Sequence, residues 1–221
     1  MQAGLFGGTF NPIHNGHLMV AQTVVHRFAL DRFYFIPCRV PPHKVPIHLA
    51  PAADRARMVR LALPMDTRYH LSDVELQRSG PSYTIDTVDH FTRQVLPGTD
   101  VYLVMGLDAF IELHTWKQFQ RLLTIIQPVV VARRLPSEAA GGNHIHKLSD
   151  YIRSRLADAY EWLDSEHCWR HPEAASIHWL PVPPMDVSSS QVRRCIRAGR
   201  TITDLVPTAV SAYIEQKDLY Q

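Results

Sequence analysis

A glycine pair near the start of the chain lies between an apolar run and a stretch with helical spacing. The apolar run is residues 3–6, the pair is Gly7 and Gly8, and residues 18–28 carry apolar side chains at helical intervals. A second apolar run, residues 32–36, follows. These segments predict a strand–helix–strand unit, which is parallel and right-handed in nearly all proteins.

Strand-like and helix-like segments alternate along the rest of the chain. The predicted strands are residues 71–76, 101–105, 129–132 and 177–180. The predicted helices are residues 54–63, 85–95, 110–123 with a break near Trp116, 151–163, 187–196 and 210–214. This order predicts an α/β fold of the Rossmann-like, doubly wound type, in which a mainly parallel sheet has helices on both faces. We expect one domain over residues 1–221, with a surface loop at about 135–149.

Composition limits the classes of partner. Hydrophobic residues make up 46% of the 221 residues, and the formal net charge is +2. Such a balanced charge argues against a nucleic acid or a membrane surface as partner. Cys38, Cys168 and Cys195 are far apart and odd in number, which argues against a disulfide framework and favours the cytoplasm. No apolar stretch has membrane-spanning length, and no signal-peptide pattern is present. The oligomeric state stays open between a monomer and a small homo-oligomer.

Ligands of open parallel sheets bind beyond the carboxyl ends of the strands. The segments that follow the predicted strands include residues 7–17, the Pro-rich stretch 41–46, residues 106–108 and the pair Arg133–Arg134. We therefore expect these four segments to meet at one site.

Residues 7–17 read Gly-Gly-Thr-Phe-Asn-Pro-Ile-His-Asn-Gly-His and have the character of a phosphate-binding turn. The glycines allow close approach of the backbone to a ligand, and a helix start favours an anion. Thr9 can donate a hydrogen bond, and His14 and His17 are close enough in sequence to address one phosphate group. Asn15 is the expected helix N-cap. The alternative is that the glycines form only a turn and the histidines cap the helix.

This string resembles the HxGH signature of the nucleotidyltransferase superfamily. The whole chain is similar to the bacterial nicotinate-nucleotide adenylyltransferases, whose landmarks occur here in family order and over nearly the full length. The two end motifs are specific, and PPHK and PSYT support them. The landmarks beyond residues 7–17 are Pro37 with Val40-Pro41-Pro42-His43-Lys44, Pro81-Ser82-Tyr83-Thr84, Gly106-Leu107-Asp108, Thr115-Trp116, Arg133-Arg134, residues 187–193 (VSSSQVR) and residues 213–220 (YIEQKDLY).

The resemblance implies transfer of the adenylyl group of ATP to nicotinate mononucleotide, which gives deamido-NAD and pyrophosphate in NAD biosynthesis. The substrate phosphate would attack the α-phosphorus in line, without a covalent enzyme intermediate. The catalytic residues that the resemblance implies are His14, His17, Lys44 and Arg193. Those it implies for ATP binding are Gly7, Gly8, Thr9, Phe10, His14, His17, Gly106, Asp108, Ser189, Ser190 and Arg193.

The resemblance also nominates residues for the acceptor. It places the nicotinate ring beside Trp116 and its carboxylate on backbone N–H groups near Tyr83 and Thr84. His43, Lys44 and Arg133 complete the implied nicotinate mononucleotide site. Backbone donors at a helix start suit a carboxylate better than a carboxamide, which favours nicotinate over nicotinamide mononucleotide.

Several of these residues also have purely structural interpretations. Residues 188–190 could serve only as an N-cap, and Asp108 could cap the following helix. Arg193 could be a solvated helix residue, and Trp116 could belong to the core. Three positions depart from the usual family residues, namely Asn11 for Asp, Ser190 for Thr and Lys117 for an aromatic.

No protein cage for a metal is evident in the sequence. The resemblance implies Mg²⁺ bound mainly through ATP phosphates and water, as magnesium dehydrates reluctantly. A zinc site is the alternative, at His144, His146, His167, Cys168 and His171, although their spacing matches no regular zinc motif. Alternatives within the superfamily are pantetheine-phosphate and nicotinamide-mononucleotide adenylyltransferases. Some aminoacyl-tRNA synthetases also have an HxGH site in their catalytic domain. They need a KMSKS-like loop as well, and this sequence lacks one.

Overall fold

A computed structural model describes residues 1–40, 49–133, 142–183 and 186–221. The chain forms two compact units. Unit 1 comprises Met1–Gly4 and Tyr83–Pro184, and unit 2 comprises Leu5–Ser82 and Met185–Gln221. His43 and Lys44 lie outside the described residues, as does the side chain of Arg133.

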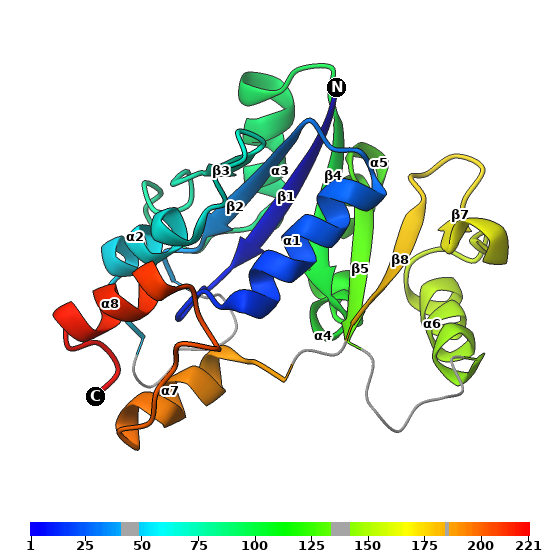
Figure 1. The fold of residues 1–221 in the computed structure, drawn as a ribbon. Coiled ribbons are helices and arrows are strands. Elements are labelled where there is room, and N and C mark those ends of the chain that lie inside the picture. Colours follow the sequence, from blue (N-terminus) through cyan, green and yellow to red (C-terminus); the bar gives the residue numbers. More distant parts are fainter. Residues whose placement is uncertain (41–48, 134–141, 184–185) are drawn as a thin grey trace. The chain divides into compact units, whose positions relative to one another are not determined.

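Unit 2 is built on the strand–helix–strand segment that the sequence predicts. Strand β1 (Gln2–Gly8), of which residues 5–8 belong to this unit, is followed by α1 (Asn15–Arg27) and β2 (Arg32–Pro37). Helix α2 (Ala52–Ala62) leads to β3 (Tyr69–Leu71), which pairs with β2 in parallel. The remaining helices, α7 (Ser189–Arg197) and α8 (Thr208–Gln216), come from the C-terminal part of the chain (Figure 1). The Tyr213 hydroxyl on α8 donates to Asp54 on α2 over 2.7 Å.

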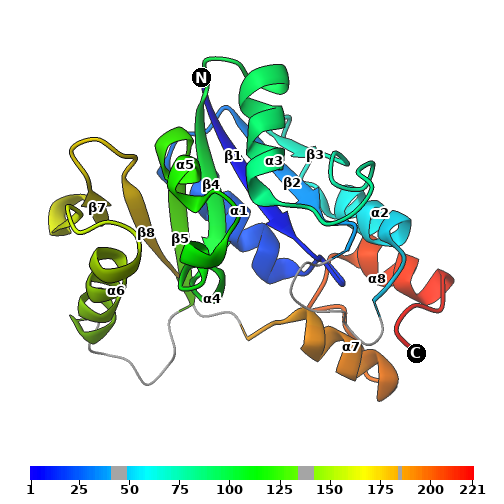
Figure 2. The same cartoon turned by 180° about the vertical axis from the view of Figure 1, so that it is seen from behind.

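Unit 1 alternates helices with parallel strands and ends in an antiparallel extension (Figure 2). Its strands are β4 (Asp100–Gly106), β5 (Gln127–Arg133), β6 (Glu161–Leu163), β7 (Cys168–Arg170) and β8 (Ile177–Val182). Its helical elements are α3 (Thr84–His90), the π-helical η1 (Phe91–Val95), α4 (Leu107–Phe110), the 3₁₀ turn η2 (Leu113–Thr115), α5 (Phe119–Ile125), α6 (Gly142–Arg155) and the 3₁₀ turn η3 (Asp164–Glu166).

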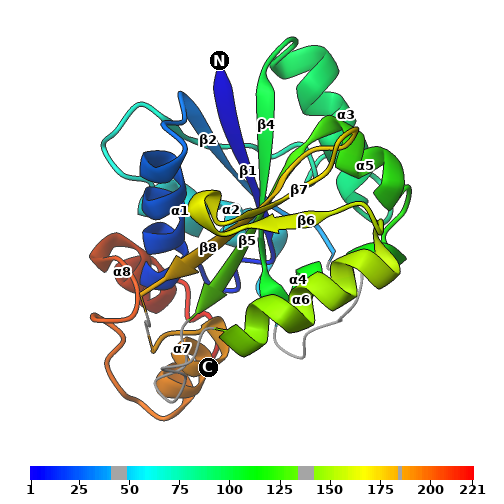
Figure 3. The ribbon, with the colours of Figure 1, turned by 90° about the vertical axis from the view of Figure 1, so that its right-hand side faces the viewer.

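The strand order is β3-β2-β1-β4-β5-β8-β7-β6, and β1 contributes residues to both units. Strands β4, β5 and β8 are parallel neighbours, whereas β6 and β7 pair antiparallel (Figure 3). Val129 and Val130 in the middle of β5 are fully buried, as expected for a strand covered on both faces. The predicted α/β fold with a mainly parallel sheet and helices is confirmed.

Three predicted elements need correction. The strand expected at 71–76 is β3, which ends at Leu71. The loop expected at about 135–149 is a helix from Gly142 onward, because α6 occupies Gly142–Arg155, while residues 134–141 lie outside the described part. The helix expected at 151–163 ends at Arg155, and its last residues form β6. Leu148, Ser149 and Ile152 are buried and define the inner side of α6, which begins at Gly142, well before the predicted start at residue 151.

No helix in the described part of the chain is long and apolar enough to span a membrane. Cys38, Cys168 and Cys195 are all buried free thiols.

Candidate active site

The HxGH segment connects β1 to α1 in unit 2. His14, in an extended conformation, is the N-cap of α1, so the predicted cap at Asn15 is wrong by one residue. The His14 backbone N–H donates to Nδ1 of His17 over 3.2 Å, and the His17 N–H donates to the His14 carbonyl over 2.9 Å. Because Nδ1 of His17 accepts a hydrogen bond, the neutral ring carries its proton on Nε2. The imidazole of His17 can therefore donate a hydrogen bond from Nε2.

Aromatic rings hold the two imidazoles in place. The rings of His14 and His17 stack, with their planes 27° apart. The Phe10 ring meets His17 edge-on, with 5.1 Å between centroids. Phe10 is buried and has φ of 46°, a backbone conformation that bulky residues rarely adopt, so packing must hold it there. His14 is 2% exposed, whereas His17 is partly exposed.

Two glycines of the segment are required by close packing. A Cβ on Gly16 would lie 3.0 Å from Val187 Cγ1 and 3.1 Å from Nδ1 of His14. A Cβ on Gly8 would lie 3.0 Å from the Phe10 ring. A Cβ on Gly7 would meet nothing within 4 Å, so its surroundings leave room for a side chain or a ligand. The Gly of HxGH thus leaves the space that the side chains of His14 and Val187 occupy.

The second phosphate signature, at the start of α7, contacts the first one directly. Ser188 is the N-cap of α7, and its hydroxyl accepts from the Gln191 N–H over 3.2 Å, as one sequence interpretation expected. The Ser189 hydroxyl donates to the Pro12 carbonyl over 2.8 Å. Arg193 Nη1 donates to the Asn11 carbonyl over 2.6 Å. Residues 177 and 182 positions apart in sequence therefore form one arrangement within unit 2.

Arg193 retains its charge in this arrangement. Its Nη2 donates to the Ser190 hydroxyl over 3.1 Å, which orients that side chain beside the guanidinium. Burial lowers the pKa of Arg193, but from a value so high that the group stays cationic at neutral pH. The exposed hydroxyl of Ser190 and the cationic fork together offer donors to an anion.

One residue of unit 2 that the sequence motifs do not include is Arg55. Its guanidinium is fully buried, and Nη1 donates to the Thr9 carbonyl over 2.7 Å. Arg55 shares the inner face of α2 with Met58, Val59 and Ala62, at i, i+3, i+4 and i+7. A cation on an otherwise apolar face is the sequence signal that could have pointed to it.

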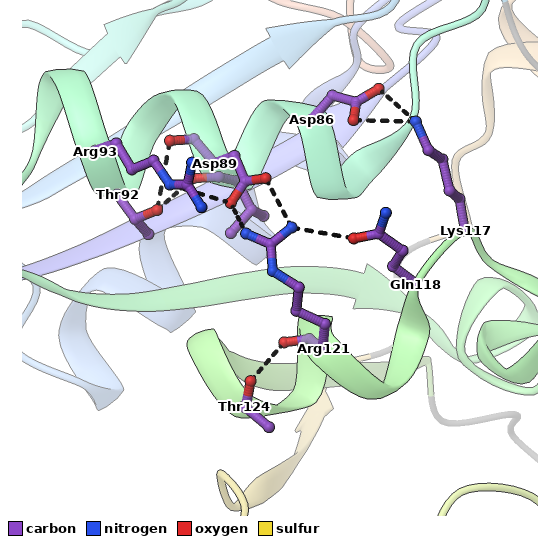
Figure 4. A network of polar contacts seen from close by, with 9 residues as sticks. Asp86, Asp89, Thr92, Arg93, Lys117, Gln118, Arg121 and Thr124 are labelled. Atoms are coloured by element: carbon purple, nitrogen blue, oxygen red, sulfur yellow. Dashed lines mark hydrogen bonds and ion pairs between the residues drawn. The ribbon is translucent and has the colours of Figure 1, made fainter.

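In unit 1, Lys117 joins the segment that holds Trp116 to the start of α3. Its ammonium lies 3.2 Å from Asp86 Oδ1 (Figure 4). The same ammonium lies 4.6 Å from the centroid of the Tyr83 ring. Tyr83 is the N-cap of α3 and is 42% exposed, and Thr84 is the first residue of the helix. Trp116 is partly exposed and follows η2. The predicted acceptor residues Tyr83, Thr84 and Trp116 therefore belong to one local structure.

A second ion pair strengthens the same part of unit 1. Arg121 on α5 donates to both carboxylate oxygens of Asp89 on α3, and to Gln118 Oε1 over 3.0 Å (Figure 4). Such two-pronged pairing fixes the relative orientation of two side chains better than a single contact does. The two ion pairs, Asp86–Lys117 and Asp89–Arg121, thus position α3 against the segment that follows η2.

The remaining predicted residues of unit 1 lie at strand ends. Gly106 ends β4 and is the N-cap of α4, so the interpretation of Asp108 as that cap is wrong. Asp108 is exposed in the first turn of α4. Arg133 is the last residue of β5. That these positions and the HxGH segment meet at one site stays a prediction.

The zinc alternative finds no support in the described part of the chain. Among the side chains that the structure describes, no group of three or more His, Cys, Asp or Glu residues could hold a metal ion. Cys168 is buried in β7 with its thiol toward Glu166, at 3.8 Å. The side chain of His144 lies outside the described part.

Comparison with known proteins places this geometry in a family. The model of the cytidylyltransferase-like family matches residues 5–195. A probable nicotinate-nucleotide adenylyltransferase of Desulfatibacillum aliphaticivorans is 36% identical over 221 residues, which is 100% of both chains. A probable nicotinate-nucleotide adenylyltransferase of Geobacter metallireducens is 36% identical over 220 residues, covering 100% of this chain and 98% of that protein.

Solved structures agree with the fold. The Plasmodium falciparum nicotinic acid mononucleotide adenylyltransferase complexed with NaAD matches 99% of this chain and 97% of its own, with a TM-score of 0.70 at 18% identity. A putative nicotinate-nucleotide adenylyltransferase from Vibrio parahaemolyticus matches with a TM-score of 0.58 at 17% identity, over 100% of this chain and 96% of its own. The chain belongs to the cytidylyltransferase-like family and, within it, to the nicotinate-nucleotide adenylyltransferases.

Proposed function

We propose that the protein transfers the adenylyl group of ATP to nicotinate mononucleotide, forming deamido-NAD and releasing pyrophosphate. The observation that carries this proposal is the direct contact between the two phosphate signatures in unit 2, through Ser189 on Pro12 and Arg193 on Asn11. The full-length similarity to nicotinate-nucleotide adenylyltransferases supplies the acceptor.

The reaction needs no nucleophile from the enzyme. The 5′-phosphate of nicotinate mononucleotide attacks the α-phosphorus of ATP, a new P–O bond forms, and the bond from the α-phosphorus to the bridging oxygen breaks. Pyrophosphate carries away the electron pair. Because the attacking phosphate is already ionised, catalysis consists of positioning and charge stabilisation. His17 Nε2 donates to the transferred phosphate in this scheme, and His14 holds His17 in orientation.

Backbone N–H groups of Gly7 to Phe10 hold the nucleotide phosphates, and Gly106 and Asp108 hold the ribose. Ser190 and Arg193 contact the β- and γ-phosphates, with Ser189 fixing their approach. Lys44 and His43 contribute donors to the phosphate of the mononucleotide, together with Arg133. These roles follow from the family resemblance and from the donors found at residues 189–193.

Mg²⁺ bound to the phosphates of ATP would neutralise part of their negative charge. This suits a site whose described side chains include no carboxylate cage, because magnesium keeps several waters and binds through phosphates. The free, buried thiols favour a reducing compartment such as the cytoplasm for the reaction. A monomer or a small homo-oligomer would serve equally.

Selection of the acceptor rests on Tyr83, Thr84 and Trp116. Trp116 supplies a face for the pyridine ring, and backbone N–H groups at residues 83–84 donate to the carboxylate. Lys117 is ion-paired with Asp86 over 3.2 Å, so these backbone donors, and not the ammonium, distinguish the two acceptors. A carboxylate gains from N–H donors at a helix start, whereas the neutral carboxamide of nicotinamide mononucleotide gains less.

The test is a comparison of acceptors. Purified protein is incubated with Mg²⁺, ATP and nicotinate mononucleotide, nicotinamide mononucleotide or pantetheine phosphate, and pyrophosphate and the dinucleotide product are measured. We expect deamido-NAD as the preferred product. Equal kcat/KM for both mononucleotides would refute the carboxylate argument, and turnover with pantetheine phosphate alone would refute the proposed function.

A further inference from the structure

The side chain of Arg55, in unit 2, is completely buried. It lies on α2, and it is among the largest fully buried side chains of the described residues. Burying a charge is unfavourable unless hydrogen bonds replace the lost water, and removing such bonds leaves a strongly destabilised ion. A fully buried arginine on an apolar helix face therefore calls for a specific role.

Three carbonyl groups surround the Arg55 fork. Nη1 donates to the Thr9 carbonyl over 2.7 Å, Nη2 donates to the Arg39 carbonyl over 2.9 Å, and Nε donates to the Ala50 carbonyl over 3.1 Å. The Ala50 N–H in turn donates to Asn11 Oδ1 over 3.1 Å. One side chain thus connects the turn after β1, the segment after β2 and the segment before α2.

The Arg55 charge is not cancelled by a carboxylate. Within residues 1–40, 49–133, 142–183 and 186–221, no Asp or Glu forms an ion pair with it. Its electrostatic neighbours are the Cys38 thiol and the Tyr220 phenol. The three carbonyl dipoles, together with the Cys38 and Tyr220 side chains, stabilise the ion, so a positive charge remains directly behind the phosphate-binding turn.

The planarity of the peptide group links the hydrogen bond from Arg55 to the Thr9 carbonyl with the direction of the neighbouring Phe10 N–H. In a trans peptide, the C=O of one residue points opposite to the N–H of the next. Because Arg55 holds the Thr9 carbonyl, it also fixes the direction of the Phe10 N–H, which points away from Arg55. Two residues further along, Arg193 donates a hydrogen bond to the Asn11 carbonyl over 2.6 Å. Two guanidinium groups therefore set the orientation of this short stretch of backbone.

We propose that Arg55 is a positioning residue of the phosphate-binding turn, which aims the Phe10 N–H at the ATP phosphates and supplies a fixed positive charge behind them. This inference rests on the proposed function. If Arg55 served only stability, its replacement would lower the free energy of unfolding but would leave ATP binding and turnover by the folded protein unchanged. The positioning role instead changes ATP affinity and kcat in molecules that are folded.

Two variants separate charge from geometry. Arg55→Lys keeps the charge but loses the planar fork, so a single ammonium cannot reach all three carbonyls in the same way. Arg55→Met removes the charge and keeps much of the volume. Arg60→Ala, at an exposed position of the same helix, is the matched control. Each variant is studied at a temperature at which its circular dichroism matches that of the wild type.

Binding of Mg²⁺ and ATP is measured by calorimetry without acceptor, and kcat and both KM values are measured with nicotinate mononucleotide. For Arg55→Lys we expect kcat/KM for ATP to fall by about tenfold to a hundredfold, with the KM for the mononucleotide nearly unchanged. Arg55→Met loses more ATP affinity than Arg55→Lys, and Arg60→Ala resembles the wild type. In a third variant, Arg55→Ala, the guanidinium is removed altogether, and added millimolar guanidinium should restore part of its ATP affinity.

The proposal is overturned if folded Arg55→Lys binds and uses ATP as the wild type does. It is also overturned if both KM values and kcat of Arg55→Lys change together in proportion to its unfolded fraction. A different result would refute the proposed function, namely that the wild-type protein forms no deamido-NAD. In that case the calorimetric comparison of Arg55→Lys with Arg60→Ala still tests Arg55, because it requires no turnover.

Discussion

The imidazole rings of His14 and His17 stack with their centroids 3.7 Å apart, and the backbones of the two residues hydrogen-bond within the same turn. These contacts fix the orientation of the His17 imidazole, which can then donate a hydrogen bond from Nε2 in a defined direction. The Nδ1 of His17 accepts from the His14 N–H, so Nε2 is the nitrogen with a proton to donate. The first prediction follows from this geometry.

Replacing His17 with Ala should lower kcat by about a hundredfold to a thousandfold, as expected for loss of one donor that stabilises transition-state charge. The KM for either substrate should change little. Initial rates of pyrophosphate release check this. His26→Ala, at an exposed position of the same helix, is the control and should behave as the wild type. Normal turnover of His17→Ala would remove His17 from the mechanism.

The bonds between the two phosphate signatures should contribute to both stability and ATP use. Ser189→Ala leaves the Pro12 carbonyl without its donor, which costs about 1–3 kcal/mol of unfolding free energy. Arg193→Ala should lose a similar amount and also raise the KM for ATP. Urea denaturation and steady-state kinetics measure the two effects. Arg194→Ala, one position further along and exposed, should change neither quantity, and an equal effect there would contradict the assignment.

The packing around Gly16 predicts a contrast with Gly7. Gly16→Ala places a methyl group 3.0 Å from Val187 Cγ1, so we expect a loss of about 1–3 kcal/mol of unfolding free energy together with displacement of His14. Gly7→Ala meets nothing within 4 Å and should keep the stability of the wild type. Thermal denaturation of both variants gives the comparison. Equal destabilisation by the two changes would show that close packing is not the reason for Gly16.

Trp116→Ala should raise the KM for nicotinate mononucleotide by about fivefold to a hundredfold, the range expected when an aromatic stacking partner is lost. The KM for ATP serves as the internal control and should stay constant. Trp116→Phe keeps a smaller ring face and should fall between the wild type and Trp116→Ala. A change in the KM for ATP alone would place Trp116 outside the acceptor site.

The Asp66–Arg68 pair predicts a pH effect on stability. Hydrogen bonds from the Arg68 side chain and backbone lower the pKa of Asp66 from 3.8 to about 2. Because the folded-state pKa is the lower one, the pair stabilises the fold above about pH 4, and this contribution disappears as the pH falls toward 2. The urea midpoints of wild type and Asp66→Asn should therefore differ at neutral pH, and the gap should narrow over that acidic range. A constant gap would exclude this pair as the cause.

Local patterns predicted the strand–turn–helix at residues 2–27, because glycine spacing and helical periodicity act within a few residues. They missed His14 as the cap, since the Asn15 side chain donates instead to the carbonyl of Asp204, a partner 189 positions away. They also missed β6 and β7, which are three residues each and depend on cross-strand packing of Trp162 on Trp169, with 4.6 Å between ring centroids. Such long-range partners are invisible to periodicity.

The candidate site shows the same division. His14, His17, Ser189 and Arg193 could be nominated from their motifs, and the structure brings them together in unit 2. Arg55 could not be nominated in this way, because its role depends on three carbonyl groups from separate segments. A charged residue on an apolar helix face indicates that some buried partner exists, but the sequence does not say which one.

The bond from Arg193 to the Asn11 carbonyl spans 182 positions of sequence, and that from Ser189 to Pro12 spans 177. During translation the turn after β1 is made well before α7. Contacts so distant in sequence form late in folding, because a long loop must close before they are made. A nascent chain therefore holds an incomplete turn until α7 has been made, and the site can bind a nucleotide only after that point.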